Sequence, residues 1–182
     1  MSGILVVCTG NICRSPMAEG FLRAALEARL GDEAPVVTSA GTAAWEGDGA
    51  TAKSIRTAAE RGVDIQPHVA RKLHGAMLED ADLIVCMAAD HRSTIVDAMP
   101  DLATKTFTIK GLVRLLEASR PGGPLRARVA AAADAAARNG SSKRSEDVRD
   151  PLGDPIEGYR EVARELHDLA DRLAVALTED PG

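Results

Sequence analysis

Short apolar runs alternate along the chain with longer stretches in which apolar residues recur every three or four positions. The run from Ile4 to Val7 is continuously apolar and β-branched, which is typical of a strand buried on both faces of a parallel sheet. The predicted strands are residues 4–7, 36–38, 82–87 and 105–109, and the predicted helices are residues 16–30, 50–61, 92–98 and 112–118. This alternation predicts an α/β fold, a three-layer sandwich with helices on both faces of a four-stranded parallel sheet.

Capping signals mark the ends of the first and last helices. Ser15 is predicted to cap the first helix, which Gly31 ends. Asp154 is predicted to cap the last helix, because Pro155 follows it and Glu157 stands at the third helical position.

The segment of about residues 120–149 departs from the alternation. A Pro-Gly-Gly-Pro break at 121–124 precedes an alanine- and arginine-rich helix predicted at 125–138, and a loose polar stretch follows at 139–143. The chain has 182 residues, which suits one hydrophobic core. Residues 1–182 are therefore expected to form a single domain with a surface insertion at about 120–149.

Composition narrows the functional classes. The net charge of −5 and only four aromatic residues (two Phe, one Trp, one Tyr) argue against a nucleic-acid-binding surface. No apolar run approaches the roughly 20 residues that cross a bilayer, and the first residues lack the pattern of a signal peptide, so we expect no membrane insertion and a cytoplasmic location. Three cysteines cannot all pair within the chain, which fits a reducing compartment.

The most informative segment is Cys8-Thr9-Gly10-Asn11-Ile12-Cys13-Arg14-Ser15, between the first strand and the first helix. A loop at this position can direct backbone N–H groups and the positive end of the helix at a single anion. Gly10 and Asn11 permit the tight turn, and Arg14 offers the two-pronged donor that matches phosphate oxygens. These donors, with the Ser15 hydroxyl, would favour the thiolate of Cys8. The pattern indicates a nucleophile that faces a bound phosphate.

The residues of this loop have other interpretations. Cys8 alone could be a buried cysteine at a strand end, with Gly10-Asn11 as an ordinary turn. A nucleotide-binding loop of the Walker type is excluded, because no Gly-Lys-Ser/Thr sequence is present. The chain has no C-x-x-C motif and its histidines are scattered, so a zinc site is not expected.

These residues resemble the low-molecular-weight protein tyrosine phosphatase family. The resemblance rests on residues 8–19, on Ser39-Ala40-Gly41-Thr42 with Trp45, on residues 62–73 and on Asp150-Pro151. It implies cysteinyl-phosphate chemistry without a metal or other cofactor, on phosphorylated proteins or small phosphomonoesters. It also implies the roles of the site residues: Cys8 is the nucleophile, Arg14 the phosphate clamp, Thr9, Gly10, Asn11, Ile12, Cys13 and Arg14 the amide donors, Asn11, Ser15, Ser39 and His68 the supports of the loop, and Asp150 the general acid.

Chemistry also supports a general acid apart from the resemblance, because a leaving oxyanion needs a proton that a nearby carboxylic acid can supply. Asp-Pro recurs at Asp154, and we assign Asp150 to chemistry because Asp154 is explained as a helix cap. Trp45, among glycines, is expected to form a wall of the substrate pocket. Single residues outside these motifs complete the expectations: His74, His91 and His167 lie at the surface, Cys86 packs in the core, and Cys13 lies where it could form a reversible disulfide with Cys8.

The function stays open between four alternatives. Members of the family that act on tyrosine carry aromatic residues after the Asp-Pro, where this chain has Leu152 and Gly153. This pattern resembles the branch that contains protein arginine phosphatases, yet that branch has a threonine where this chain has Ile12, and an apolar residue there favours a phenyl ring. Arsenate reductases on this scaffold carry two further cysteines after the third strand, where this chain has only Cys86. We therefore expect a phosphotyrosine phosphatase rather than an arginine phosphatase, an arsenate reductase or a non-catalytic phosphopeptide-binding module.

Overall fold

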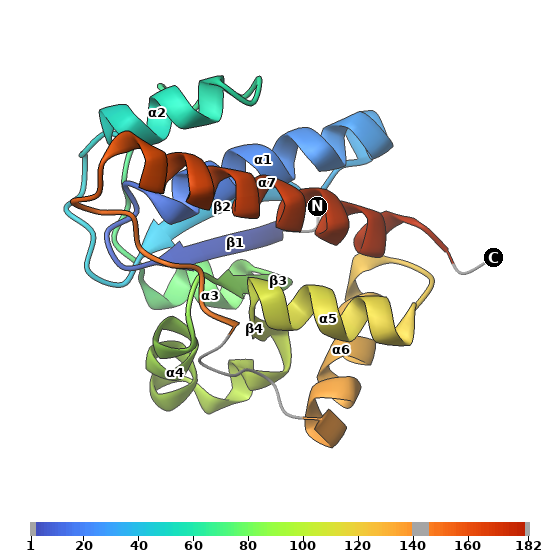
Figure 1. Cartoon of the computed structure of the whole chain (residues 1–182). Coiled ribbons are helices and arrows are strands. Elements are labelled where there is room, and N and C mark those ends of the chain that lie inside the picture. Colours follow the sequence, from blue (N-terminus) through green and yellow to red (C-terminus); the bar gives the residue numbers. More distant parts are fainter. Residues whose placement is uncertain (1–2, 140–145, 181–182) are drawn as a thin grey trace.

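A four-stranded parallel sheet organises the molecule in the computed structural model, which describes residues 3–139 and 146–180 (Figure 1). The strands are β1 (Gly3–Cys8), β2 (Val36–Gly41), β3 (Leu83–Cys86) and β4 (Thr106–Thr108). Their spatial order is β2-β1-β3-β4, and every neighbouring pair is parallel, so the predicted α/β class and parallel sheet are confirmed. β1 lies inside the sheet with β2 and β3 on its two sides, and its carboxyl end carries the cysteine loop.

Helices cover both faces of this sheet, as the sequence predicts. The helices are α1 (Arg14–Leu30), α2 (Ala52–Ala59), α3 (Gly75–Asp80), α4 (Ala89–Ala98), α5 (Ile109–Ser119), α6 (Leu125–Asn139) and α7 (Ile156–Thr178), with short 3₁₀ turns at Gly31–Glu33 and Pro100–Lys105. Side chains of β1 alternate between the faces: Ile4 and Val6 join the core beneath α1, α5 and α7, whereas Leu5 and Val7 join the core beneath α3 and α4.

The ends of the helices correct several predictions. α1 begins at Arg14, with Cys13 as its N-cap residue and no capping side chain. The prediction that Ser15 caps this helix is therefore wrong. The Ser15 hydroxyl is bonded to Cys8 and Asn11 and is not available to the helix end. Gly31 ends α1 at a φ of 55°, as predicted. The six-residue helix α3 was not predicted, because it is too short to show an apolar period.

α6 lies within the segment expected to be a surface insertion. It packs against α5, and Val129, Ala132 and Ala135 are buried in the same core as α1 and α7 (Figure 1). Arg128 is also buried and holds this helix to the carboxyl end of α7. The predicted loose stretch at 139–143 falls mostly on residues 140–145, outside the described residues.

Candidate active site

The cysteine loop connects the end of β1 directly to the start of α1, since Cys8 is the last strand residue and Arg14 the first helical one. The chain reverses at Asn11, whose φ of 54° lies in the left-handed region that asparagine tolerates. Gly41 of β2 passes so close that a Cβ there would lie 2.5 Å from the Thr9 carbonyl oxygen and 2.9 Å from the Asn11 nitrogen. Only glycine fits at this position without moving the loop.

The outer side of the loop is defined by its carbonyl groups. Each of five carbonyl oxygens accepts a hydrogen bond: Cys8 from Thr42 N (3.0 Å), Thr9 from Ala43 N (2.9 Å), Asn11 from His68 Nε2 (2.8 Å), Ile12 from Thr51 N (2.9 Å) and Cys13 from Met17 N (3.4 Å). In a trans peptide the N–H that follows a carbonyl points in the opposite direction. The five amides that follow therefore face the concave side of the loop; they belong to Thr9, Gly10, Ile12, Cys13 and Arg14.

The Cys8 thiol lies at the base of this concave side. Its Sγ is 2.9 Å from Ser15 Oγ and accepts a hydrogen bond from the Asn11 amide at 3.2 Å. Only 2% of the residue is exposed, so the sulfur is held among donors rather than in bulk water. The polar neighbours of the sulfur are thus one hydroxyl and one backbone amide.

Asn11 is the central residue of the loop's supports. Its side-chain amide nitrogen donates to Ser15 Oγ and Ser39 Oγ, both at 2.8 Å, and its carbonyl oxygen on the main chain accepts from His68. The structure thus brings together all four residues expected to support the loop. Asn11, Ser15 and Ser39 are fully buried, so each of these bonds replaces water that cannot enter.

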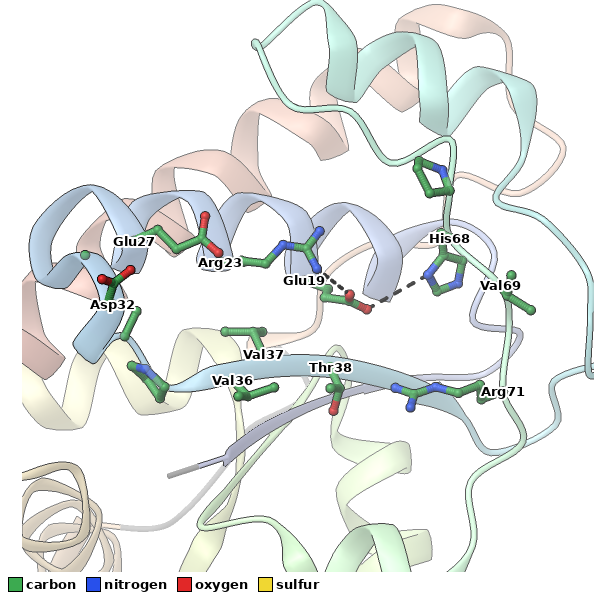
Figure 2. A pocket seen from close by; sticks show the side chains of 14 residues that line it. Glu19, Arg23, Glu27, Asp32, Val36, Val37, Thr38, His68, Val69 and Arg71 are labelled. Carbon is green, nitrogen blue, oxygen red and sulfur yellow. Dashed lines mark hydrogen bonds and ion pairs between the residues drawn. The ribbon is translucent and has the colours of Figure 1, made fainter. Parts of the chain in front are cut away.

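Two further supports were missed by the sequence interpretation. The Arg71 backbone N–H donates to Asn11 Oδ1 at 2.9 Å, and Glu19 Oε2 accepts from Ser39 Oγ at 2.6 Å. The Glu19 carboxylate also lies 3.9 Å from His68 Nδ1 and pairs with Arg23 at 3.0 Å (Figure 2). A sequence signal for Glu19 exists, because it lies one helical turn after the loop residue Ser15 and therefore on the same side of α1.

A groove of about 830 Å³ runs between α1 and β2 on the outside of these supports. Glu19, His68 and Arg71 line it together with Arg23 and Glu27, as Figure 2 shows. None of its lining residues is Cys8, Arg14 or Asp150, so it is separate from the concave side of the cysteine loop.

Arg14 and Asp150 meet beside the loop. Arg14 is 6% exposed, and its guanidinium donates to Asp150 Oδ2 at 2.5 Å and to the Val148 carbonyl oxygen at 3.2 Å. The Asp150 side chain is 44% exposed and also accepts from the Leu152 N–H at 3.1 Å. The segment before α7 is fixed by the bond from Val148 N to the Met87 carbonyl oxygen at 2.8 Å. The structure therefore brings Arg14 and Asp150 together beside the loop that carries Cys8.

Asp154 does not cap the last helix, so that prediction is wrong. The N-cap residue of α7 is Pro155, and no side chain bonds the first amides of the helix. The Asp154 carboxylate instead forms an ion pair with Arg149, because a guanidinium five residues earlier attracts it more strongly than a neutral amide does.

His91 is buried, contrary to the expectation of a surface residue. It is 6% exposed, and its Nε2 lies 2.9 Å from Thr9 Oγ1 in the cysteine loop. Burial, with a contribution from the positive charge of Arg14, lowers the pKa of His91 to about 4. His74 is exposed as expected, whereas the His167 ring is partly buried edge-on against Phe21, at 5.1 Å between ring centroids.

Trp45 is 80% exposed and therefore is not a core residue. Its loop is held beside the cysteine loop, because Gly47 N donates to the Ala70 carbonyl oxygen and Thr51 N to that of Ile12. Cys86 is fully buried, as expected, and burial raises its pKa to about 12. The Cys13 thiol lies 3.7 Å from Thr51 Oγ1 and 3.6 Å from Tyr159 Oη.

Comparison with known proteins identifies the family. The low molecular weight phosphotyrosine protein phosphatase family matches residues 3–120, which is more than half of the chain. The chain belongs to this family. The match includes Cys8, Arg14 and the residues that support the loop, whereas Asp150 lies beyond it.

Relatives of this phosphatase extend the comparison over the full chain. It is 33% identical to a protein-arginine-phosphatase of Geobacillus stearothermophilus over 174 residues, which cover 96% of this chain and 95% of that one. It is 37% identical to a probable low molecular weight protein-tyrosine-phosphatase of Erwinia amylovora over 121 residues, which cover 66% of this chain and 80% of that one. The solved structure of a low molecular weight protein tyrosine phosphatase from T. tengcongensis superposes with a TM-score of 0.71 at 36% identity and covers 95% of this chain and 97% of that chain.

The family defines the general activity. This protein is a phosphatase of the low-molecular-weight, cysteine-dependent type. Within residues 3–139 and 146–180, no group of three or more histidine, cysteine, aspartate or glutamate side chains is placed to hold a metal ion.

Proposed function

We propose that this phosphatase hydrolyses phosphomonoesters through a phosphate ester of Cys8. The observation that carries the proposal is the loop geometry: the Cys8 thiol accepts a bond from the Asn11 amide and contacts Ser15 Oγ, and the same loop ends at Arg14, whose guanidinium meets Asp150. Donors fixed in this way stabilise the charge on the three equatorial oxygens of a phosphoryl group during transfer.

In the first step the Cys8 thiolate attacks phosphorus, and the bond between phosphorus and the leaving oxygen breaks. The leaving oxygen takes the proton of Asp150, which lies beside Arg14 at the rim of the loop. The bond to Cys8 sulfur now holds the phosphoryl group. The Ser15 hydroxyl, 2.9 Å from the sulfur, stabilises the thiolate both before attack and as a leaving group.

In the second step a water molecule attacks phosphorus, and the bond between sulfur and phosphorus breaks. Asp150, now ionised, accepts a proton from that water. Inorganic phosphate leaves, and both Cys8 and Asp150 return to their starting states. No oxidant, metal or cofactor enters this balance.

We propose phosphotyrosine in proteins as the substrate. The choice rests on Ile12, an apolar residue within the cysteine loop. Its side chain packs against Gly10, with Cγ1 3.3 Å from the position that a Cβ of residue 10 would take. The apolar side chain of Trp45 is 80% exposed and lies on the segment after β2, which bonds the cysteine loop at Ile12. An apolar rim suits a phenyl ring better than a charged guanidinium.

Protein arginine phosphate is the second candidate. It is favoured by the relative from Geobacillus stearothermophilus, which aligns over 95% of its own length and is named a protein-arginine-phosphatase. Leu152-Gly153 after the Asp-Pro points the same way.

The test compares kcat/KM for peptides carrying phosphotyrosine, phosphoarginine and phosphoserine on one preparation. We expect phosphotyrosine to be hydrolysed fastest, and Ile12→Thr to shift the ratio toward phosphoarginine. A preference for phosphoarginine in the unaltered chain would overturn the substrate proposal. Cys8→Ser is expected to be inactive on all three peptides, and thioredoxin-coupled reduction of arsenate would favour the reductase alternative.

We further propose a cytoplasmic location for a single domain that acts on phosphorylated proteins and binds neither nucleic acid nor membranes. None of the described helices is both long and apolar enough to cross a membrane. The three cysteines are free thiols, as in proteins of reducing compartments.

A further inference from the structure

His91 approaches the cysteine loop from a different element than the known supports. It lies in the first turn of α4, directly after β3, whereas His68 reaches the loop from the segment that pairs with the end of β2. Because β1 lies between β2 and β3, the two histidines hold the loop from opposite sides. His68 bonds the second half of the loop at Asn11, and His91 bonds the first half at Thr9.

The first half of the loop has few other attachments. The Thr9 carbonyl oxygen accepts from Ala43 N, and Gly10 has no side chain that could be held. The Thr9 hydroxyl is therefore the one side-chain polar group between Cys8 and Asn11, and its partner is His91 Nε2 at 2.9 Å. The amides of Thr9 and Gly10, which face the concave side, lie on this part of the chain.

We propose that His91 is a positioning residue of the phosphatase reaction: its bond to the Thr9 hydroxyl fixes the first half of the cysteine loop and so directs the Thr9 and Gly10 amides at the bound phosphate. The inference rests on the proposed role of the loop in binding phosphate. His91 would act through Thr9 and not by touching the reacting atoms.

The chemistry of the site supports a role for the imidazole beyond filling space. Among the described residues, His91 Nδ1 is buried without a hydrogen-bond partner, a cost that an apolar side chain of similar size would avoid. Burial and Arg14 keep the pKa of His91 at about 4, although Asp90, Asp147 and Asp150 act in the opposite direction. The imidazole is thus neutral at neutral pH and does not compete with the guanidinium of Arg14 for the phosphate.

A double-mutant cycle tests this inference, with Thr9→Val, His91→Leu and the double variant. The measurements are kcat/KM for an aryl phosphate, the Ki of inorganic phosphate and the melting temperature. Each single variant should lose about tenfold in kcat/KM and raise the phosphate Ki by a similar factor, in keeping with one displaced hydrogen bond in the site. The kcat/KM of the double variant should be no lower than that of the less active single variant. His91→Gln, which keeps a polar atom near the Nε2 position, should recover most of the lost kcat/KM.

Matched controls separate this role from a purely structural one. His74→Leu replaces an exposed histidine and should leave all three measurements unchanged. Losses that multiply in the double variant, or a lower melting temperature with an unchanged phosphate Ki, would overturn the inference. Should His91→Leu fail to fold, Thr9→Val decides alone, because it removes only the hydroxyl, and an unchanged Ki would then be decisive against it. Activity in Cys8→Ser would instead contradict the proposed function itself.

Discussion

The Arg14 side chain makes two hydrogen bonds from one planar group. Its guanidinium donates through two different nitrogens, to Asp150 and to the Val148 carbonyl oxygen, while only 6% of the residue is exposed. A lysine would keep the charge but not the planar pair of donors.

We predict that Arg14→Lys lowers kcat/KM by about 10²-fold or more, because an ammonium cannot make two aligned hydrogen bonds to the equatorial oxygens of the phosphoryl group. Steady-state kinetics with an aryl phosphate measure this loss. Near-normal kinetics would show that net charge alone is sufficient.

Asp150→Ala tests the general acid, and its effect should depend on the leaving group. On a phosphotyrosine peptide kcat/KM should fall about 10²- to 10⁴-fold, and the loss should shrink as the leaving phenol becomes more acidic. Asp154→Ala is the matched control, since the Asp154 carboxylate lies in an exposed ion pair with Arg149 and should not alter the dependence on the leaving group. A steep dependence in Asp154→Ala and none in Asp150→Ala would reverse the two assignments.

At this scale the sequence reveals residues that are contiguous and hides those that tertiary structure brings together. The octet from Cys8 to Ser15 was readable because its spacing carries its chemistry. The roles of His91, Glu19 and Arg71 could not be predicted, because the residues next to each of them in the sequence do not indicate its contact with the cysteine loop or its supports. The Asp154 cap was wrong because Arg149 offers that carboxylate a charged partner.

At the scale of elements, the Cys13 side chain connects the cysteine loop to two helices, α2 and α7. This thiol contacts Thr51, the N-cap residue of α2, and Tyr159 of α7. Burial and the Cys13 contact raise the pKa of Tyr159 to about 12, so the phenol stays protonated and can donate to the sulfur. A disulfide with Cys8 would require Cys13 to leave both partners.

We predict that peroxide inactivates the enzyme reversibly through such a disulfide, because the Cys8 thiolate oxidises readily and Cys13 can resolve the sulfenic acid. The measurement is the activity recovered after peroxide and then thiol reductant. Cys13→Ser should recover less than the unaltered chain, and Cys86→Ser, which changes a fully buried thiol, is the control. Equal recovery in Cys13→Ser would contradict the prediction.

The sequence predicts whether a segment is a strand or a helix, because the spacing of apolar residues is a property of the segment itself. It predicts the ends of these elements less well. α2 runs from Ala52 to Ala59 rather than over residues 50–61, because the Thr51 side chain caps it. α4 begins at Ala89, three residues before the predicted start, where Ala89 N bonds Asp147 Oδ1. That partner lies 58 positions away along the chain.

For the molecule as a whole, Arg128 joins distant parts of the chain. Its guanidinium, 2% exposed in its side chain, donates to the carbonyl oxygens of Pro121, Gly123, Ala176 and Glu179 and to the Asp180 carboxylate. It thereby holds the start of α6 to the end of α7, and α7 in turn lies against α1.

We predict that Arg128→Met lowers the free energy of unfolding by roughly 2 to 4 kcal/mol, because several acceptors lose a buried charged donor. Denaturation in urea measures the change, and kcat/KM at low temperature should be unaffected. Arg126→Met is the control, since the Arg126 side chain is 81% exposed. Equal stability of the two variants would show that the buried guanidinium contributes nothing beyond its exposed neighbour.

The contact between Arg14 and Asp150 implies that a side chain of the free enzyme competes with the substrate for the guanidinium. The Asp150 side chain already bonds the guanidinium that a phosphate must reach, so the substrate has to replace Asp150 at Arg14 when it binds. Asp150→Ala should therefore bind inorganic phosphate or vanadate more tightly than the unaltered chain, with a lower Ki, even as its turnover falls. A variant that binds more tightly while reacting more slowly would retain its phosphorylated partners, which makes it a reagent for isolating them.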